Sequence, residues 1–294
     1  MRFKTLLALT LLAFIWPLAG RAAEADFDVS VFGNGRPFLM IPGMSSGMEV
    51  WEDAAHRYGV QFRVHRFTLA GFAGQPAVPG PFIDRMVTAL KTYVEQNDIH
   101  DAIIMGHSVG GIIALELAAE EPDRFSNVVA VDILPFLGGA SLGAKDAAQA
   151  AKIIERYKAQ MESIPPATFL AQQKAQASSQ VGGPDKIDML GRWIDGSDAS
   201  TIITATCELY AQDFRPVLAR VGARTLVIYV WNPAANIDTR TLDAIYKAQY
   251  ADLSGVTLKR IDNSKSFVMF DQRDAFFRAI DDFLSAPVQL GANR

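Results

Sequence analysis

Residues 102–117 read AIIMGHSVGGIIALEL, which is an apolar run, a serine flanked by glycines, and a second apolar run. The pattern Gly106-x-Ser108-x-Gly110 occurs by chance in many chains, but here a strand pattern precedes it and a helix pattern follows. This context predicts a sharp strand-to-helix turn with a strained backbone, which would project the Ser108 hydroxyl above the edge of a sheet. The helix N-terminus beneath Ser108 would stabilise negative charge on a reacting oxygen.

Strand and helix patterns alternate on both sides of this turn. Apolar or alternating runs predict strands near 28–32, 37–41, 62–69, 102–105, 128–134, 225–230 and 256–261. Apolar residues at helical spacing predict helices over 83–94, from the turn to about 119, from 239 onward and over 271–284. Such alternation predicts an α/β fold with a mostly parallel central sheet covered by helices.

The stretch from 138 to 216 is built differently. It is rich in alanine, glutamine and lysine, and its pattern favours helices near 144–162, 167–178 and 199–211. Breaks fall at Pro165-Pro166 and at Gly182-Gly183-Pro184. We therefore predict a core of residues 23–137 and 217–294, with an inserted helical cap at 138–216 over a site.

The first 22 residues have the pattern of a secretory signal peptide. Arg2 and Lys4 precede an apolar run over 6–16, and small residues follow, with cleavage expected after Ala22 or Ala25. The run is shorter than the about 20 residues that cross a bilayer. The sequence thus predicts an exported protein, periplasmic or secreted, without a stable membrane anchor.

Composition excludes several classes of partner. Removing residues 1–22 takes away Arg2, Lys4 and Arg21, which leaves 25 basic against 32 acidic residues, a net charge of −7. Nucleic-acid binding would need a basic face, so we expect none. The one cysteine, Cys207, cannot form an internal disulfide. Metal, phosphate-loop and dinucleotide motifs do not occur in the sequence, and we expect no cofactor and no metal site.

Beyond the serine turn, the chain resembles the α/β-hydrolase family, in particular its esterases and lipases with a helical cap. Residues 41–44 read IPGM and match the loop after the third strand, where the family usually has His-Gly. The resemblance implies an oxyanion hole from the main-chain N–H groups of Met44 and Val109. Residues 68–74, TLAGFAG, replace the family's usual Asp-x-x-Gly-x-Gly loop.

The same resemblance exposes a missing catalytic base. The family has its histidine after the last strand, in a pattern like Gly-His-Phe, and here residues 262–271 read DNSKSFVMFD. Ser266 therefore stands at the histidine position. Serine needs a neighbouring base to take its proton. Lys265 is a poor substitute because its side chain should point away from that of Ser266.

None of the four histidines is a convincing replacement. His107 lies within the turn, where neighbouring side chains diverge, and is expected to pack beside it. His65 falls in mid-strand, short of the sheet edge, and is expected to lie in the core. His56 and His100 are expected on the surface.

Two residues compete for the role of the acid that the family uses to orient its histidine. Asp238 follows the strand at 225–230, the family's usual place, but an aspartate directly before a helix is more often its N-cap. Asp132 follows an earlier strand, where some family members carry the acid. The sequence leaves both open.

Two functions follow from these residues. The resemblance implies a serine hydrolase for small or medium hydrophobic carboxylic esters, weak or atypical because loss of one triad member costs about 10⁴ to 10⁶ in turnover. The alternative is an inactive pseudoenzyme that binds a hydrophobic or acyl ligand under the cap, since hormone-receptor relatives in this fold have lost the same histidine. Met44, Trp231, Phe267 and Met269 are candidates for an apolar pocket wall or for core.

Overall fold

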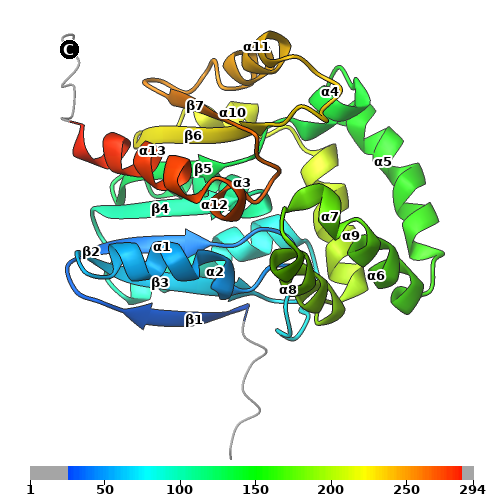
Figure 1. Ribbon diagram of the computed structural model, residues 1–294, viewed down its shortest axis with the longest axis horizontal. Coiled ribbons are helices and arrows are strands. Elements are labelled where there is room, and N and C mark those ends of the chain that lie inside the picture. Colours follow the sequence, from blue (N-terminus) through cyan, green and yellow to red (C-terminus); the bar gives the residue numbers. More distant parts are fainter. Residues whose placement is uncertain (1–25, 287–294) are drawn as a thin grey trace, which may run out of the picture.

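A seven-stranded sheet forms the centre of the molecule in the computed structural model, which describes residues 26–286 (Figure 1). The strand order is β1-β3-β2-β4-β5-β6-β7; β1 runs antiparallel to β3 and all other pairs are parallel. The strands are β1 (Phe27–Phe32), β2 (Arg36–Ile41), β3 (Phe62–Leu69), β4 (Ala102–His107), β5 (Phe125–Val131), β6 (Arg224–Trp231) and β7 (Thr257–Asp262). The prediction of an α/β fold with a mostly parallel sheet is confirmed. The predicted signal peptide, residues 1–22, lies outside the described residues.

Helices cover both faces of the sheet because its strands are apolar on both sides. In β2, Phe38 and Met40 belong to one hydrophobic cluster, while Leu39 and Ile41 belong to the other. The first cluster includes α1 (Glu52–Tyr58), α12 (Val268–Asp271) and α13 (Arg273–Ser285). The second includes α2 (Phe82–Gln96), α3 (Val109–Glu120) and α11 (Thr239–Gln249). A short η1 (Met48–Trp51) leads into α1.

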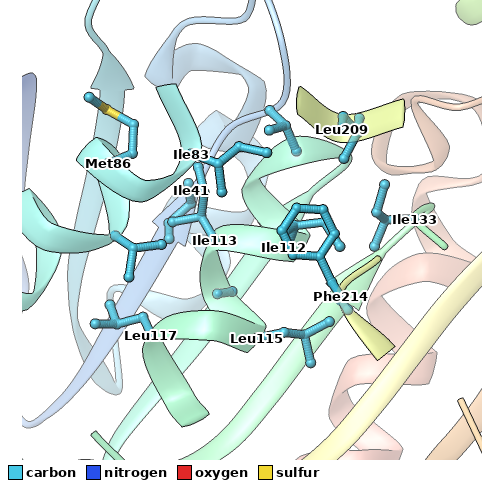
Figure 2. Packing of buried hydrophobic residues seen from close by; sticks show 14 of the residues in the cluster. Ile41, Ile83, Met86, Ile112, Ile113, Leu115, Leu117, Ile133, Leu209 and Phe214 are labelled. Carbon is cyan, nitrogen blue, oxygen red and sulfur yellow. The ribbon is translucent and has the colours of Figure 1, made fainter. Parts of the chain in front are cut away.

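Helix α3, which follows Ser108, is apolar nearly all round because it is enclosed by other elements. Figure 2 shows Ile112, Ile113, Leu115 and Leu117 of α3 among Ile41 of β2, Ile83 and Met86 of α2, and Leu209 and Phe214 further along the chain. A helix that is buried on all sides is fixed in position by its packing. The backbone turn that starts it is therefore fixed as well.

The chain between β5 and β6 is entirely helical. It forms α4 (Leu137–Leu142), α5 (Ala147–Glu162), α6 (Pro166–Ala175), α7 (Ala177–Gln180), α8 (Pro184–Asp195), α9 (Ala199–Ala211) and α10 (Arg215–Leu218). Figure 1 shows α5 to α9 grouped beyond one end of the sheet. Residues of α4, α6, α7, α8 and α9 line a pocket together with Ser108, so these helices cover the edge where β4 ends.

The sequence pattern predicted α5, α9 and the stretch of α6 and α7, and it did not predict α4, α8 or α10. Helix α8 was not expected, although it begins as helices often do, with Pro184 at its first position after Gly183. It buries Leu190, Trp193 and Ile194. Helix α4 is only six residues long and half glycine and alanine, too short for a periodic signal. Within residues 26–286 no helix has the length and hydropathy needed to cross a membrane.

Candidate active site

Ser108 occupies the strained turn between β4 and α3. Its backbone has φ 52° and ψ −125°, a combination that non-glycine residues rarely adopt. A Cβ on Gly106 would overlap the carbonyl oxygen of Gly110, and a Cβ on Gly110 would overlap that of Pro42. Only glycine fits at these two positions. Hydrogen bonds from Ser108 N to Val131 O (2.9 Å) and from Gly111 N to Ser108 O (2.8 Å) hold the turn.

The two main-chain amides expected to form an oxyanion hole flank this turn. Met44 follows β2, and Val109 is the first residue of α3, whose N–H has no partner within a helix. Neither amide donates a hydrogen bond to another of the residues 26–286. The loop after β2 closes with a hydrogen bond from Ser46 N to Gly43 O (3.2 Å). Both donors are therefore free to bind an oxygen atom.

A pocket of about 240 Å³ opens between Ser108 and the cap. Its apolar lining residues are Met44, Leu137, Leu190, Ile194, Ile202 and Leu209. Its polar lining residues are Ser45, Ser108, Gln173, Gln180, Thr206 and Tyr210. Larger surface hollows exist elsewhere on the described part of the chain, but this one contains the strained serine. The pocket is therefore the place where Ser108 can meet a ligand.

Of the four apolar residues considered for the pocket wall, only Met44 lines it. Phe267 and Met269 are buried in the hydrophobic cluster beneath α12 and α13. Trp231 donates a hydrogen bond from its indole Nε1 to the carbonyl oxygen of Ile237 (2.9 Å). Those three side chains have structural roles. The helices between β5 and β6 supply most of the pocket wall instead, through side chains on five of them.

Ser266 lies between His107 and Asp132 in a small polar network. His107 Nε2 is 3.1 Å from the Ser266 carbonyl oxygen and 3.2 Å from its hydroxyl oxygen. The Asp132 carboxylate lies near the Ser266 side chain, whose hydroxyl acts to lower the pKa of that carboxyl group. The His107 ring packs on Phe267, with 4.8 Å between ring centroids. The loop after β7 is thus tied to the turns after β4 and β5.

His107 is neutral and turned away from the role of base. Burial lowers its pKa to about 4, and its hydrogen bond to the Ser266 main chain only partly opposes that change. Because a carbonyl oxygen can only accept, Nε2 carries the proton. The buried Nδ1 has no hydrogen-bond partner among residues 26–286 and faces Gly43, where a Cβ would lie 2.6 Å away. Neither nitrogen is directed to take a proton from Ser108.

The two acid candidates are in very different places. Asp132 leaves β5 with φ 50°, so the strand expected to reach 134 ends at Val131. Desolvation raises the pKa of Asp132 to about 6, although the Ser266 side chain and the main chain of Val230 lower it. Asp238 is exposed and caps α11, accepting from Arg240 N (2.9 Å) and Thr241 N (3.1 Å). Only Asp132 contacts the residue at the histidine position.

None of the other side chains considered as a base lines the pocket of Ser108. His65 is buried and pairs with the Tyr93 hydroxyl at 2.7 Å. His56 and His100 are exposed and pair with acidic side chains near them in the sequence. Lys265 Nζ donates to the carbonyl oxygens of Ser178 (2.6 Å) and Val181 (3.3 Å) of the cap. Across residues 26–286, no group of three His, Cys, Asp or Glu side chains is arranged to hold a metal ion.

Sequence reasoning missed the polar residues of the cap that line the pocket. Gln173 on α6, Gln180 on α7 and Tyr210 on α9 are half-buried beside Ser108. Glutamines are frequent along this stretch, and no motif distinguishes these two from Gln172 or Gln176. Only the fold of the cap selects them.

Comparison with known proteins agrees with this geometry. The model of the α/β-hydrolase family matches residues 38–279. Among solved structures, an enol-lactonase from Burkholderia xenovorans superposes with a TM-score of 0.72 at 18% identity, covering 88% of this chain and 96% of that one. An esterase from Thermogutta terrifontis superposes with a TM-score of 0.70 at 17% identity, covering 88% and 92%. At sequence identities this low, the similarity shows a shared fold alone.

Curated relatives match over shorter segments. The (lyso)-N-acylphosphatidylethanolamine lipase of Homo sapiens is 31% identical over 101 residues, which is 33% of this chain and 30% of the lipase. The pimeloyl-[acyl-carrier protein] methyl ester esterase of Vibrio cholerae is 28% identical over 105 residues, which is 36% of this chain and 40% of the esterase. The chain thus spans well under half the length of these two relatives.

Proposed function

Because this chain belongs to the α/β-hydrolase family, we propose that it is a serine hydrolase of small carboxylic esters whose turnover is limited by the absence of a histidine base. One observation supports the proposal above the others. Ser108 has the strained geometry of a nucleophile, and it opens into a pocket beside the free amides of Met44 and Val109. The curated relatives that are esterases and lipases favour ester chemistry over the other reactions of this fold.

The proposed reaction follows from which groups are present. The Ser108 oxygen attacks the ester carbonyl carbon, and the carbonyl oxygen, as it becomes negative, accepts hydrogen bonds from Met44 N and Val109 N. The Ser108 proton passes to water because Ser266 cannot accept it as an imidazole would. The C–O bond to the alkoxide breaks as that oxygen takes a proton from water and leaves as the alcohol, and a second water then hydrolyses the acyl-serine to the carboxylic acid and free Ser108. The oxyanion hole and substrate binding alone give a rate about 10³- to 10⁴-fold above the uncatalysed rate.

A second function, ligand binding without turnover, is supported by the network around Ser266. His107 donates to Ser266, and Ser266 contacts Asp132, so the position that lost its imidazole has its own set of hydrogen bonds. A pocket maintained for binding a small acyl ligand needs no base.

Hydrolysis of p-nitrophenyl butyrate by the purified protein tests the proposal. We expect slow release of p-nitrophenol that Ser108→Ala reduces to the level of buffer, because the substitution removes only the attacking oxygen. Ser254→Ala, at an exposed serine before β7 that does not line the pocket, is the control and should retain the rate. An inert wild-type protein would favour the binding function. Rapid turnover would contradict the limit that we attribute to the missing base.

We also propose that the protein is exported, on the evidence of the N-terminal sequence. The charged, apolar and small-residue regions of residues 1–25 follow one another in the order of a signal peptide. Intact-mass measurement of protein from the extracytoplasmic fraction should give a chain that begins at Ala23 or Asp26. A chain retaining Met1 in the cytosol would contradict export.

A further inference from the structure

The pocket beside Ser108 is lined by both aliphatic and polar side chains. Leu190, Ile194, Ile202 and Leu209 provide aliphatic surface from α8 and α9. The lining also includes Gln173 of α6, Gln180 of α7 and Tyr210 of α9. A lining made for a purely hydrocarbon chain would not include three large hydrogen-bonding side chains, because desolvating them without a partner costs free energy.

The side-chain polar groups of Gln173, Gln180 and Tyr210 have no hydrogen-bond partner in the described part of the chain. Within residues 26–286, no side-chain hydrogen bond is formed by Gln173, Gln180 or Tyr210. The hydrogen bonds of the two glutamines are made by their main-chain oxygens, which accept from Gln176 N and Phe267 N respectively. All three residues are half-buried. Their hydrogen-bonding capacity is therefore available to a molecule in the pocket.

The main chain that carries Gln180 is held in place by contacts with the segment after β7. The main chain at Gln180 accepts from Phe267 N (3.2 Å), and the next loop donates from Gly182 N to the Asp271 carboxylate (2.8 Å). Lys265 Nζ binds the carbonyl oxygens of Ser178 and Val181. The segment that carries Gln180 is therefore attached at several points to the loop that carries Ser266. A side chain on a fixed backbone can select among ligands, because little ordering is needed on binding.

Size and charge restrict the ligand further. A volume of about 240 Å³ is below the roughly 300–1,000 Å³ of pockets that hold drug-sized ligands. No Asp, Glu, Lys, Arg or His side chain lines it, so an ionised group would be buried without a counter-ion. The small volume disfavours long acyl chains, and the uncharged lining disfavours charged molecules.

We propose that the substrate or ligand of this site is a short, neutral carboxylic ester that bears a second hydrogen-bonding group, such as a hydroxyl. Gln173, Gln180 and Tyr210 bind that second group, while the aliphatic side chains of the pocket contact the carbon chain. This inference rests on the proposed function and narrows it. The ester carbonyl lies at Ser108, and the second group lies under α6 and α7.

A pair of ligands of equal shape tests the inference. Ethyl 3-hydroxybutyrate and ethyl 3-methylbutyrate differ by a hydroxyl in place of a methyl group, and ethyl dodecanoate tests length. Dissociation constants are measured on Ser108→Ala by ligand-observed NMR, so that turnover does not interfere. We expect the hydroxy ester to bind about tenfold more tightly than its isostere. We expect ethyl dodecanoate to bind more weakly than either.

Substitutions then assign the preference to the glutamines. Adding Gln173→Leu and Gln180→Leu together should abolish or reverse the preference, whereas Gln172→Leu, at the exposed neighbouring position, should leave it unchanged. Equal affinity for the two isosteres, a preference that survives the double substitution, or tight binding of ethyl dodecanoate would overturn the inference. Because binding is measured without turnover, a clear preference in a protein that hydrolyses no ester would reject the hydrolase proposal alone.

Discussion

Replacing Ser266 with histidine should raise kcat/KM for p-nitrophenyl butyrate by at least about 100-fold. A triad histidine contributes about 10⁴ to 10⁶ in turnover, and an introduced one lacks part of the natural positioning. The reason to expect a gain is that Asp132 already contacts residue 266. An imidazole there would have a carboxylate to orient it and to stabilise its protonated form. Steady-state rates for wild type and Ser266→His give the ratio.

Two controls separate this gain from indirect effects. Ser266→Ala breaks the same contacts with His107 and Asp132 without adding a base, and it should not raise the rate. In the Ser266→His background, Asp132→Asn should lower the rate at least about tenfold, while Asp238→Asn should leave it unchanged. A folded Ser266→His protein no faster than wild type would refute the assignment of position 266. Loss of rate on Asp238→Asn alone would make Asp238 the acid.

Asp132→Asn in the otherwise unmodified protein should increase stability at pH 7.5 and not at pH 4. Desolvation raises the pKa of Asp132 from 3.8 to about 6, so the folded state binds more protons than the unfolded state between these values. Stability then falls as pH rises through that window. Across that window the free energy of unfolding falls by at most ~3 kcal/mol. Because the asparagine amide stays neutral, we expect Asp132→Asn to be more stable than wild type by ~1–3 kcal/mol at pH 7.5. Urea unfolding at the two pH values measures it.

His107 has the opposite effect on stability and does not disturb the comparison. Burial lowers its pKa from 6.5 to about 4, so its contribution is present above pH 6.5 and is lost as pH falls through 4. This contribution is common to wild type and Asp132→Asn, and it cancels in their difference. Asp238→Asn is the matched control. Its hydrogen bonds to the helix N-terminus lower the pKa of Asp238, so that substitution should not stabilise at pH 7.5. A less stable Asp132→Asn protein at pH 7.5 would contradict the argument.

Local sequence was sufficient to predict the sheet and the serine turn. The strand predicted over 62–69 is β3, and the helix predicted after Ser108 is α3. Both signals are local: hydrophobic periodicity reports which faces of a segment are buried, and the glycines around Ser108 report crowding between atoms a few residues apart. The family was evident from the same residues, and the family model supports it. The absence of a histidine after the last strand is likewise a fact of the sequence.

The acid, the pocket and the partners of His107 were decided only by the tertiary structure. Asp132 and Ser266 are separated by 134 positions in the chain, and β6 lies between the strands that they follow. Their contact depends on how far each strand runs before its loop begins, and Asp132 leaves β5 three residues earlier than the sequence suggested. Gln173 and Gln180 reach the pocket because α6 and α7 fold over it. Local patterns report burial and turn geometry, whereas these contacts arise from the packing of elements distant in sequence.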